Sequence, residues 1–192
     1  HTYEEVNTGM VDSKFGTAIE TGQADQLVQY VLSLSHIQLL GFHCHVGSQV
    51  FDEDVLEKAT QVMLGFISHI SKKLQFEASV LDIGGGFGVR YTESDPIVDL
   101  DARIHSIADV FYSTCEKQQI PCPKLYMEPG RSIVADAGMT LYTVGSIKQI
   151  PGYRNYVSVD GGMSDNPRYA LYRSAYTCLP AGKMKEGRNV KA

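Results

Sequence analysis

The sequence predicts an α/β fold made of parallel strand–helix units, and within that class part of a TIM-type (β/α)8 barrel. Strand-like and helical stretches alternate along the chain, which is typical of parallel sheets covered by helices. Residues 80–83 lack the alternation of a half-exposed strand and are typical of a strand buried on both faces. Four expected strand ends, His45, Gly84, Glu128 and Asp160, are 39, 44 and 32 residues apart. These spacings approach the roughly 31 residues per unit of an eight-unit barrel.

Each element has a local reason in the sequence. Apolar residues recur at helical spacing in three stretches, which are therefore expected to be amphipathic helices. Strands are expected where apolar runs stop at glycine or proline, because Gly47, Gly84 and Pro129 favour turns. The predicted helices cover residues 24–34, 53–73 and 100–119, and the predicted strands cover residues 37–46, 80–83, 125–128 and 156–160.

The length of the chain limits how much of a barrel it can form. Four strands are expected, and six if residues 1–6 and the long apolar, β-branched stretch 133–150 are counted. Eight full units would need about 250 residues, whereas the chain has 192. We therefore expect residues 1–192 to form one incomplete barrel domain that belongs to a larger protein.

Composition and charge favour a protein that acts on small molecules. The formal net charge is −5, the pI is near 5.6 and the basic residues are scattered, which argues against nucleic-acid and anionic-membrane partners. No run of about 18 apolar residues is present and residues 1–9 do not resemble a signal peptide. The four cysteines have no CxxC spacing, so reduced thiols and a cytoplasmic location are expected.

Two histidines near the end of the first predicted strand allow more than one kind of site. His43 and His45 are two apart and share one face of the strand, with Ser48 just beyond. They could begin a metal site, stack against an aromatic phosphorylated ligand, or be purely structural. His69 and His105 lie in predicted helices and no third histidine reaches a strand end. The sequence therefore predicts no metal ion.

The next two strand ends favour an anion. Gly84, Gly85 and Gly86 offer backbone N–H groups with no Cβ in the way, although glycines also serve tight turns and the Rossmann spacing is absent. Glu128 and Arg131 flank a Pro-Gly turn, where ligands bind in α/β folds, although a structural ion pair is the simpler alternative. Taken with Ser48, these groups predict a phosphate site.

Several motifs together resemble one known family. The chain is similar to the alanine-racemase-like, pyridoxal-phosphate-dependent decarboxylases over nearly its whole length and in the family's order. The motifs are TGMVDSKFG at 8–16, HVGSQ at 45–49, LDIGGGFG at 81–88, MEPGRSIV at 127–134, VDGGMSDN at 159–166 and PRYALY at 167–172. The last departs from the family's usual RPALY, which leaves the backbone after Arg168 less restrained.

The resemblance implies a role for each of these residues. Glu128 would keep the pyridoxal ring nitrogen protonated, which is what makes this cofactor an electron sink. His45 would stack on the ring, and both residues would be catalytic. Further cofactor contacts would come from Ser48, Gly84, Gly85, Gly86, Pro129, Gly130 and Arg131. Arg131, Arg168 and Tyr172 would grip the carboxylates of an amino-acid substrate, which suits a planar guanidinium.

The resemblance also implies an activity for the complete protein. It would be a homodimer that removes one carboxylate of meso-diaminopimelate to give L-lysine. The cofactor lysine would precede His1, and a catalytic cysteine in a C-terminal β domain would follow Ala192, so the chain alone is expected to be inactive. Alternatives are a decarboxylase of arginine or of a carboxylated polyamine of the carboxynorspermidine type, a non-catalytic pyridoxal- or phosphate-binding barrel, and a metal hydrolase built on His43 and His45.

Overall fold

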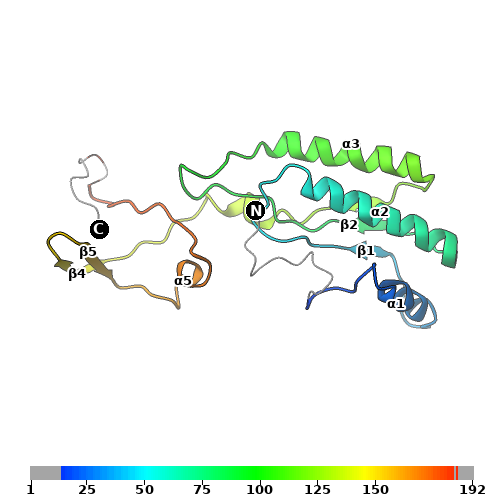
Figure 1. Cartoon of the computed structure of the whole chain (residues 1–192), viewed down its shortest axis with the longest axis horizontal. Helices are drawn as coiled ribbons and strands as arrows, with labels where there is room; N and C mark the ends of the chain where they lie inside the picture. Colours follow the sequence, from blue (N-terminus) through cyan, green and yellow to red (C-terminus); the bar gives the residue numbers. More distant parts are fainter. Residues whose placement is uncertain (1–13, 184, 186–192) are drawn as a thin grey trace. The chain divides into compact units, whose positions relative to one another are not determined.

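The structure is a computed structural model that describes residues 14–183 and 185. Two compact units make up the chain (Figure 1). Unit 1 comprises the chain up to Arg90 together with residues 96–135, and unit 2 comprises residues 91–95 and the chain from Asp136 onward. The predicted site residues up to Arg131 therefore belong to unit 1, and Arg168 and Tyr172 belong to unit 2.

Unit 1 is built on a three-stranded parallel sheet with the order β1-β2-β3. The strands are β1 (Gly41–His43), β2 (Val80–Asp82) and β3 (Lys124–Tyr126). Phe42 pairs with Leu81, and Leu81 pairs with Leu125. Because the strands are parallel and in register, their carboxyl ends meet at the same edge of the sheet. That edge is where the predicted site residues of unit 1 follow the strands.

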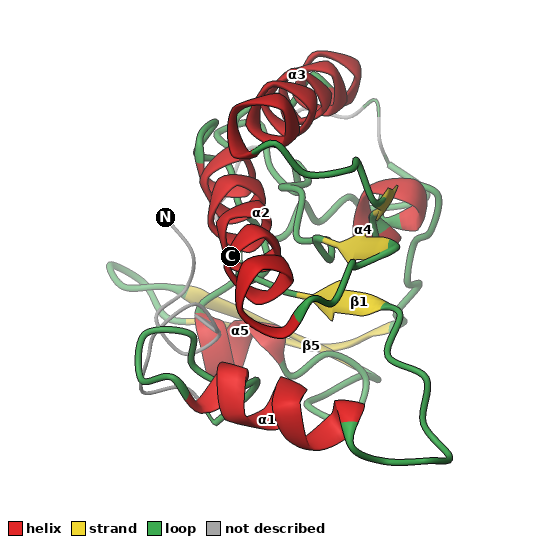
Figure 2. Ribbon diagram, turned by 90° about the vertical axis from the view of Figure 1, so that its right-hand side faces the viewer, coloured by secondary structure: helices red, strands yellow, loops and turns green. Residues whose placement is uncertain are grey.

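Helices connect these strands and bury one apolar core. Helix α2 (Val55–Leu74) links β1 to β2, and α3 (Leu100–Gln118) links β2 to β3. The two helices run side by side along the sheet (Figures 1 and 2). Their apolar faces pack with the middle strand, whose Leu81 is fully buried. The central members of this core are Leu56, Leu64, Leu81, Ile83, Ile107 and Phe111.

Helix α1 (Gln23–Leu32) packs against a second apolar cluster. Ala24 and Val28 of α1 meet Phe66 and Ile70 of α2. Phe42 of β1 packs against both the main core and this second cluster. Its ring lies edge-on to Phe66, with the ring centroids 5.1 Å apart. The sheet is thus covered by helices that sequence periodicity located, and the α/β prediction is confirmed.

The three predicted helices are confirmed, but the strands are shorter than expected. The predicted strand 37–46 is paired only over β1, and Ile37 and Leu40 before it are exposed. Gly41 can pair with Val80 because it has no side chain. A Cβ at this position would lie 1.8 Å from the Val80 carbonyl oxygen. Expected strand residues 1–6 lie outside the described part of the chain.

Unit 2 contains an antiparallel hairpin, which corrects one prediction. Strands β4 (Val144–Gln149) and β5 (Asn155–Val159) pair antiparallel, with Lys148 opposite Tyr156. Asp160 therefore does not end a parallel barrel strand, and the prediction made from its spacing was wrong. The reason is the short connection, because residues 150–154 are too few for the crossover that parallel strands require.

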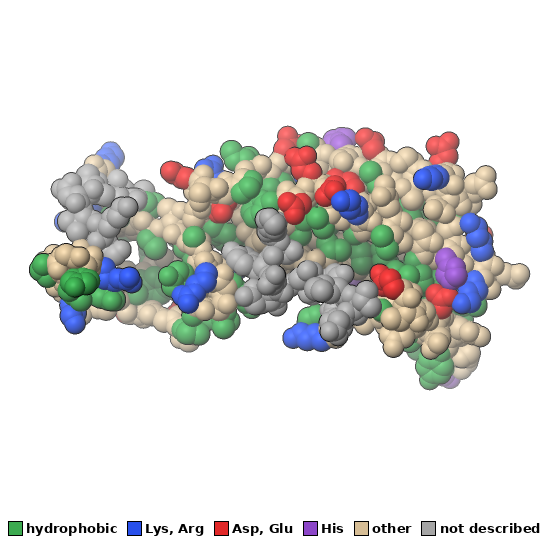
Figure 3. All heavy atoms as spheres, viewed as in Figure 1, with side chains coloured by type: hydrophobic (Ala, Val, Ile, Leu, Met, Phe, Trp, Pro, Cys, Tyr) green, Lys and Arg blue, Asp and Glu red, His purple; other side chains and the backbone are tan. Residues whose placement is uncertain are grey.

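Two short helices complete the elements. Helix α4 (Gly130–Val134) follows the Pro129 turn directly, so the expected β-like stretch 133–150 begins as helix and becomes a strand only at Val144. Helix α5 (Arg168–Tyr172) carries the two remaining predicted site residues. Within residues 14–183 and 185, no helix combines the length and the apolar character that a membrane crossing needs. On the face shown in Figure 3, basic side chains are scattered and acidic ones are spread over α3.

Candidate functional site

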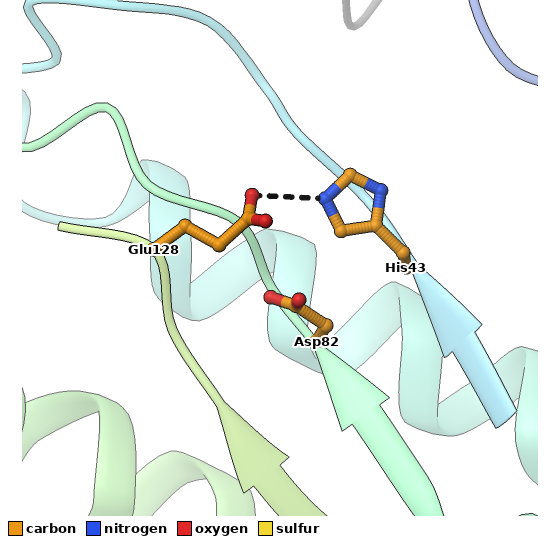
Figure 4. Close-up of side chains that lie close together, drawn as sticks. All are labelled: His43, Asp82 and Glu128. Carbon is orange, nitrogen blue, oxygen red and sulfur yellow. Dashed lines mark hydrogen bonds and ion pairs between the residues drawn. The ribbon is translucent and has the colours of Figure 1, made fainter. Parts of the chain in front are cut away.

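Three polar side chains converge where the three parallel strands end (Figure 4). His43 ends β1, Asp82 ends β2 in register with it, and Glu128 follows β3 by two residues. One ligand-type atom from each of these residues lies within 4.8 Å of the others. His43 Nε2 is 3.2 Å from Glu128 Oε2. The parallel register therefore assembles a cluster from residues up to 85 positions apart.

Asp82 also organises its surroundings. Its Oδ1 accepts a hydrogen bond from the backbone N–H of Gly84 at 2.9 Å, which starts the glycine turn after β2. Burial, and secondarily the negative charge of Asp82, raises the pKa of the neighbouring Cys44 thiol to about 11. Cys44 is thus a protonated thiol at neutral pH, and we assign it no chemistry at the site.

A cavity of about 330 Å³ lies among the loops that follow the three strands. This volume falls at the lower end of the range usual for small-molecule sites. Seven of the predicted cofactor residues line it, whereas Gly84 and Gly85 do not. The lining residues are His45, Ser48, Gln49, Gly86, Phe87, Glu128, Pro129, Gly130, Arg131 and Ser132.

The glycines after β2 are required by close backbone contacts. A Cβ on Gly85 would lie 2.0 Å from the carbonyl oxygen of Glu128, and one on Gly86 would lie 2.1 Å from that of Gly47. Gly84 and Gly86 also have positive φ, at 69° and 98°, which other L-residues adopt at a cost. The glycine turn therefore packs directly against the loop after β1 and against the loop after β3.

The N–H groups of this turn are less free than the sequence suggested. Gly84 donates to Asp82 at 2.9 Å, and Gly85 points to His45 Nδ1 at 3.4 Å. The expectation that all three glycine N–H groups converge unpaired on an anion is wrong for Gly84. The contact between the Gly85 N–H and His45 Nδ1 is long for a hydrogen bond.

Arg131 is the cation of this cavity. It lies in the first turn of α4, and its Nη1 is buried with no hydrogen-bond partner. Glu128 pairs with His43 instead, and Glu128 and Arg131 form no ion pair within the described residues. The alternative of a structural Glu128–Arg131 pair is therefore not supported. A buried guanidinium nitrogen without an acceptor costs free energy, so the position suits an anionic ligand.

Gln49 holds the wall of the cavity, and its role was not inferred from the sequence. It is buried and has a positive φ of 58°. Its side-chain amide donates to the Val89 carbonyl and accepts from the Val89 N–H, both at 2.9 Å. This pair of bonds fixes the loop after β1 to the loop after β2. The sequence signal was present, since Gln49 closes the HVGSQ motif.

The two predicted substrate residues of unit 2 lie on α5. The Arg168 guanidinium carbon lies 5.4 Å from the centroid of the Tyr91 ring, and its Nη1 is 3.4 Å from the Tyr91 hydroxyl. Its Nε is buried without a partner, and Tyr172 is half-buried. Arg131 belongs to unit 1, so the convergence of these three residues on one substrate stays a prediction.

Comparison with known proteins gives the family. Residues 1–135 match the family described as pyridoxal-dependent decarboxylase, pyridoxal binding domain. The chain belongs to this family. The resemblance inferred from the motifs is therefore confirmed, and with it pyridoxal phosphate as the cofactor.

Individual relatives carry a more specific name. The chain is 42% identical to the diaminopimelate decarboxylase of Bacillus subtilis over 97% of its own length and 42% of that protein. It is 40% identical to the Staphylococcus aureus diaminopimelate decarboxylase, again over 97% of the chain and 43% of the relative. The chain thus spans about two fifths of the curated relatives it matches, which agrees with the expectation of a partial barrel.

Solved structures support the fold. The diaminopimelate decarboxylase of M. jannaschii, solved with L-lysine, superposes with a TM-score of 0.80 at 31% identity, covering 92% of this chain and 40% of that one. The Helicobacter pylori enzyme, also with L-lysine, superposes with a TM-score of 0.77 at 27% identity, covering 92% and 41%. The predicted barrel class of the pyridoxal-phosphate-dependent decarboxylases is confirmed by these neighbours.

The residues in the cavity fit this cofactor. The buried, unpartnered Arg131 Nη1 suits a phosphate oxygen, and the Ser48 hydroxyl lines the same cavity. Glu128 would offer its carboxylate to a ring nitrogen, and His45 lines the same cavity. A guanidinium, a carboxylate and an imidazole are thus all present in the segments that follow the parallel strands of unit 1.

Proposed function

We propose that the complete protein is a pyridoxal-phosphate-dependent decarboxylase that removes one carboxylate of meso-diaminopimelate to give L-lysine. The observation that carries the proposal is the cavity beside Glu128 with the unpartnered guanidinium of Arg131 in its wall. The names of the relatives, which are 40–42% identical to this chain over the aligned part, support the substrate.

Each residue has a defined task in this proposal. Bound pyridoxal phosphate withdraws electrons from the substrate carbon that loses its carboxylate. Glu128 holds a proton on the ring nitrogen by offering a carboxylate acceptor, and His43 orients Glu128 through the 3.2 Å contact. His45 packs on the ring face and, together with the protein walls, excludes water. Ser48, Gly86 and Arg131 bind the phosphate and fix the cofactor's position.

The wider features of the enzyme belong to the same proposal. Arg131, Arg168 and Tyr172 would bind the carboxylates of the amino-acid substrate, with Gly84, Gly85, Pro129 and Gly130 shaping the cofactor site. We propose a cytoplasmic homodimer in which unit 1 is part of the barrel domain. Assays of the complete protein with meso-diaminopimelate, arginine and carboxynorspermidine distinguish the proposed substrate from the two alternatives. Turnover of either alternative at a rate equal to that of meso-diaminopimelate would refute the substrate assignment.

Cofactor binding can be tested on this chain. Equilibrium dialysis with pyridoxal phosphate should show saturable binding that Arg131→Ala weakens about tenfold or more, because a charge-assisted hydrogen bond to the phosphate is lost. Arg154→Ala is the matched control, since Arg154 is an exposed arginine in the turn between β4 and β5, and it should bind as the unaltered chain does. Equal affinity of the Arg131→Ala chain would place the phosphate elsewhere.

A metal site is the second candidate, because His43, Asp82 and Glu128 bring three ligand atoms within 4.8 Å. This cluster was not expected from the sequence, which predicted no metal ion because no third histidine reaches a strand end. Zn²⁺ titration followed by calorimetry separates the two candidates, since Glu128 cannot both coordinate a cation and bind a protonated ring nitrogen. Tight Zn²⁺ binding that pyridoxal phosphate does not affect would favour the metal site.

A further inference from the structure

The segments that follow β1 and β2 pair at two separate points. The strand pairing of the sheet ends at His43, opposite Asp82. Farther along, Val50 forms an isolated parallel bridge with Phe87, and its N–H donates to the Gly86 carbonyl at 2.8 Å. The two segments thus separate after the sheet and come together again at this bridge.

Gln49 fastens this second point of pairing through its side chain. Both of its side-chain hydrogen bonds go to the backbone of Val89, one to the carbonyl and one from the N–H, each at 2.9 Å. Gln49 is buried and has a φ of 58°, a left-handed conformation that residues with a Cβ disfavour. Such a conformation persists only where surrounding contacts hold it, and the paired bonds to Val89 are contacts of that kind.

The residues next to the second pairing are the ones that line the cavity. Ser48 directly precedes Gln49, and Gly86 accepts the hydrogen bond from Val50. Ser48 and Gly86 both line the cavity. Because the bridge and the Gln49 side chain join the two segments immediately beside these residues, they determine how far apart Ser48 and Gly86 lie.

We propose that Gln49 is a positioning residue for the phosphate of the cofactor, because its bonds to Val89 hold Ser48 and Gly86 at the separation that the phosphate requires. This inference rests on the proposed function, which assigns the cavity to pyridoxal phosphate. Gln49 does not touch the reacting atoms. It orders two loops before the ligand arrives, so that binding does not have to supply the free energy of ordering them. An amide suits this task because it donates and accepts at once and carries no charge.

Hydrogen exchange of the 192-residue chain without cofactor tests whether Gln49 joins the loops. Gln49→Gly removes both side-chain bonds, while glycine adopts a positive φ without strain. The backbone amides of Val50, Gly88 and Val89 should then exchange at least about tenfold faster than in the unaltered chain, with α1 unchanged. Gln61→Ala, which replaces an exposed glutamine of α2, is the matched control and should leave these amides unchanged. Equal exchange of the three amides in Gln49→Gly and the unaltered chain would overturn the inference.

Equilibrium dialysis with pyridoxal phosphate and with pyridoxal, which lacks the phosphate, tests the consequence for binding. Gln49→Gly should bind pyridoxal phosphate about tenfold or more weakly and pyridoxal within about twofold of the unaltered chain, since the lost bonds order only the phosphate groups. An equal loss for both compounds overturns the inference, because Gln49 would then support the cavity as a whole. Unchanged affinity for pyridoxal phosphate overturns it as well. If the unaltered chain itself does not bind pyridoxal phosphate, the cofactor assignment is refuted and this inference with it.

Gln49→Glu adds a readout that a loss of packing would not produce. The ionised carboxylate can accept from the Val89 N–H but has no proton for the Val89 carbonyl, whereas the protonated form can make both bonds. The unaltered chain should therefore bind pyridoxal phosphate about tenfold or more tightly than Gln49→Glu at about pH 8, and only about threefold or less at about pH 5, because burial favours the protonated carboxyl. Gln61→Glu should bind as the unaltered chain does at both pH values. A ratio for Gln49→Glu that stays constant over this range would overturn the positioning role.

Discussion

At the scale of single residues, Glu128 is the group on which the proposed chemistry depends most. In the complete enzyme, Glu128→Gln should leave the cofactor bound but lower turnover by at least about a hundredfold, because a neutral amide does not hold a proton on the ring nitrogen. Steady-state kinetics and cofactor absorbance measure the two effects separately. Glu116→Gln, an exposed carboxylate on α3, should change neither. Near-normal turnover of Glu128→Gln would show that the carboxylate serves only to pair with His43.

Gly85 provides a residue-scale test of how the site is packed. A Cβ there would lie 2.0 Å from the Glu128 carbonyl oxygen, so Gly85→Ala must displace the loop after β3. We expect a loss of about 1–3 kcal/mol in the free energy of unfolding, as for overpacking elsewhere, together with weaker pyridoxal phosphate binding. Urea unfolding and dialysis measure both.

The matched control for this substitution lies in α2. A Cβ on Gly65 meets nothing within 4 Å, and alanine is favoured over glycine inside a helix by up to about 1 kcal/mol. Gly65→Ala should therefore stabilise the chain and leave cofactor binding unchanged. If Gly85→Ala is as stable as Gly65→Ala, the loops after β2 and β3 do not approach each other this closely in solution.

At the scale of elements, one half-buried carboxylate adds to the apolar packing of α1 on α2. Asp25 of α1 accepts from Lys73 Nζ at 2.6 Å and lies 2.7 Å from His69 Nε2, both on α2. The hydrogen bond from Lys73, followed by that from His69, lowers the pKa of Asp25. A carboxylate whose pKa is lower in the folded state stabilises that state above the unfolded value near 3.9, and the contribution is lost as pH falls through the folded value.

Asp25→Asn should therefore loosen α1 at neutral pH. Hydrogen exchange of the α1 backbone amides is expected to quicken in the variant at pH 7, while the two chains become alike at pH low enough to protonate Asp25. Asp109→Asn, an exposed aspartate in the middle of α3, serves as the control and should leave α1 unchanged. If α1 exchanges at the same rate in Asp25→Asn and the unaltered chain at pH 7, the contacts of Asp25 with Lys73 and His69 do not hold α1 on α2.

At the scale of the whole molecule, none of the described lysines of unit 1 stands where the cofactor could be bound covalently. Such a lysine must lie at the ligand end of a strand and be neutral part of the time. Lys124 begins β3 at the end opposite Glu128, and Lys14 lies against the ring of Phe15. The others belong to helices: Lys58, Lys72 and Lys73 in α2 and Lys117 in α3.

We therefore expect the 192-residue chain to bind pyridoxal phosphate without a covalent bond and to have no decarboxylase activity. Reduction of the mixture with borohydride, followed by peptide mapping, should find no stoichiometric pyridoxyl-lysine. One such lysine, together with lysine formation from meso-diaminopimelate, would show that the chain is catalytically sufficient.

The sequence by itself determined the features that depend on neighbouring residues. Helical periodicity located α1, α2 and α3, and the glycine and proline that stop apolar runs located the ends of β2 and β3. The order of the motifs was enough to identify the family, because residue types at fixed spacing carry that information. These features follow from local backbone preferences and from the chemistry of each side chain.

Only the tertiary structure decided what depends on residues brought together from distant positions. The antiparallel pairing of β4 with β5 reflects a connection too short for a crossover, which the spacing of strand ends did not reveal. The pairing of Glu128 with His43 rather than Arg131 and the engagement of the Gly84 N–H both depend on register and loop path. Contacts of this kind follow from the packing of loops against one another. Helical periodicity and motif spacing do not predict that packing.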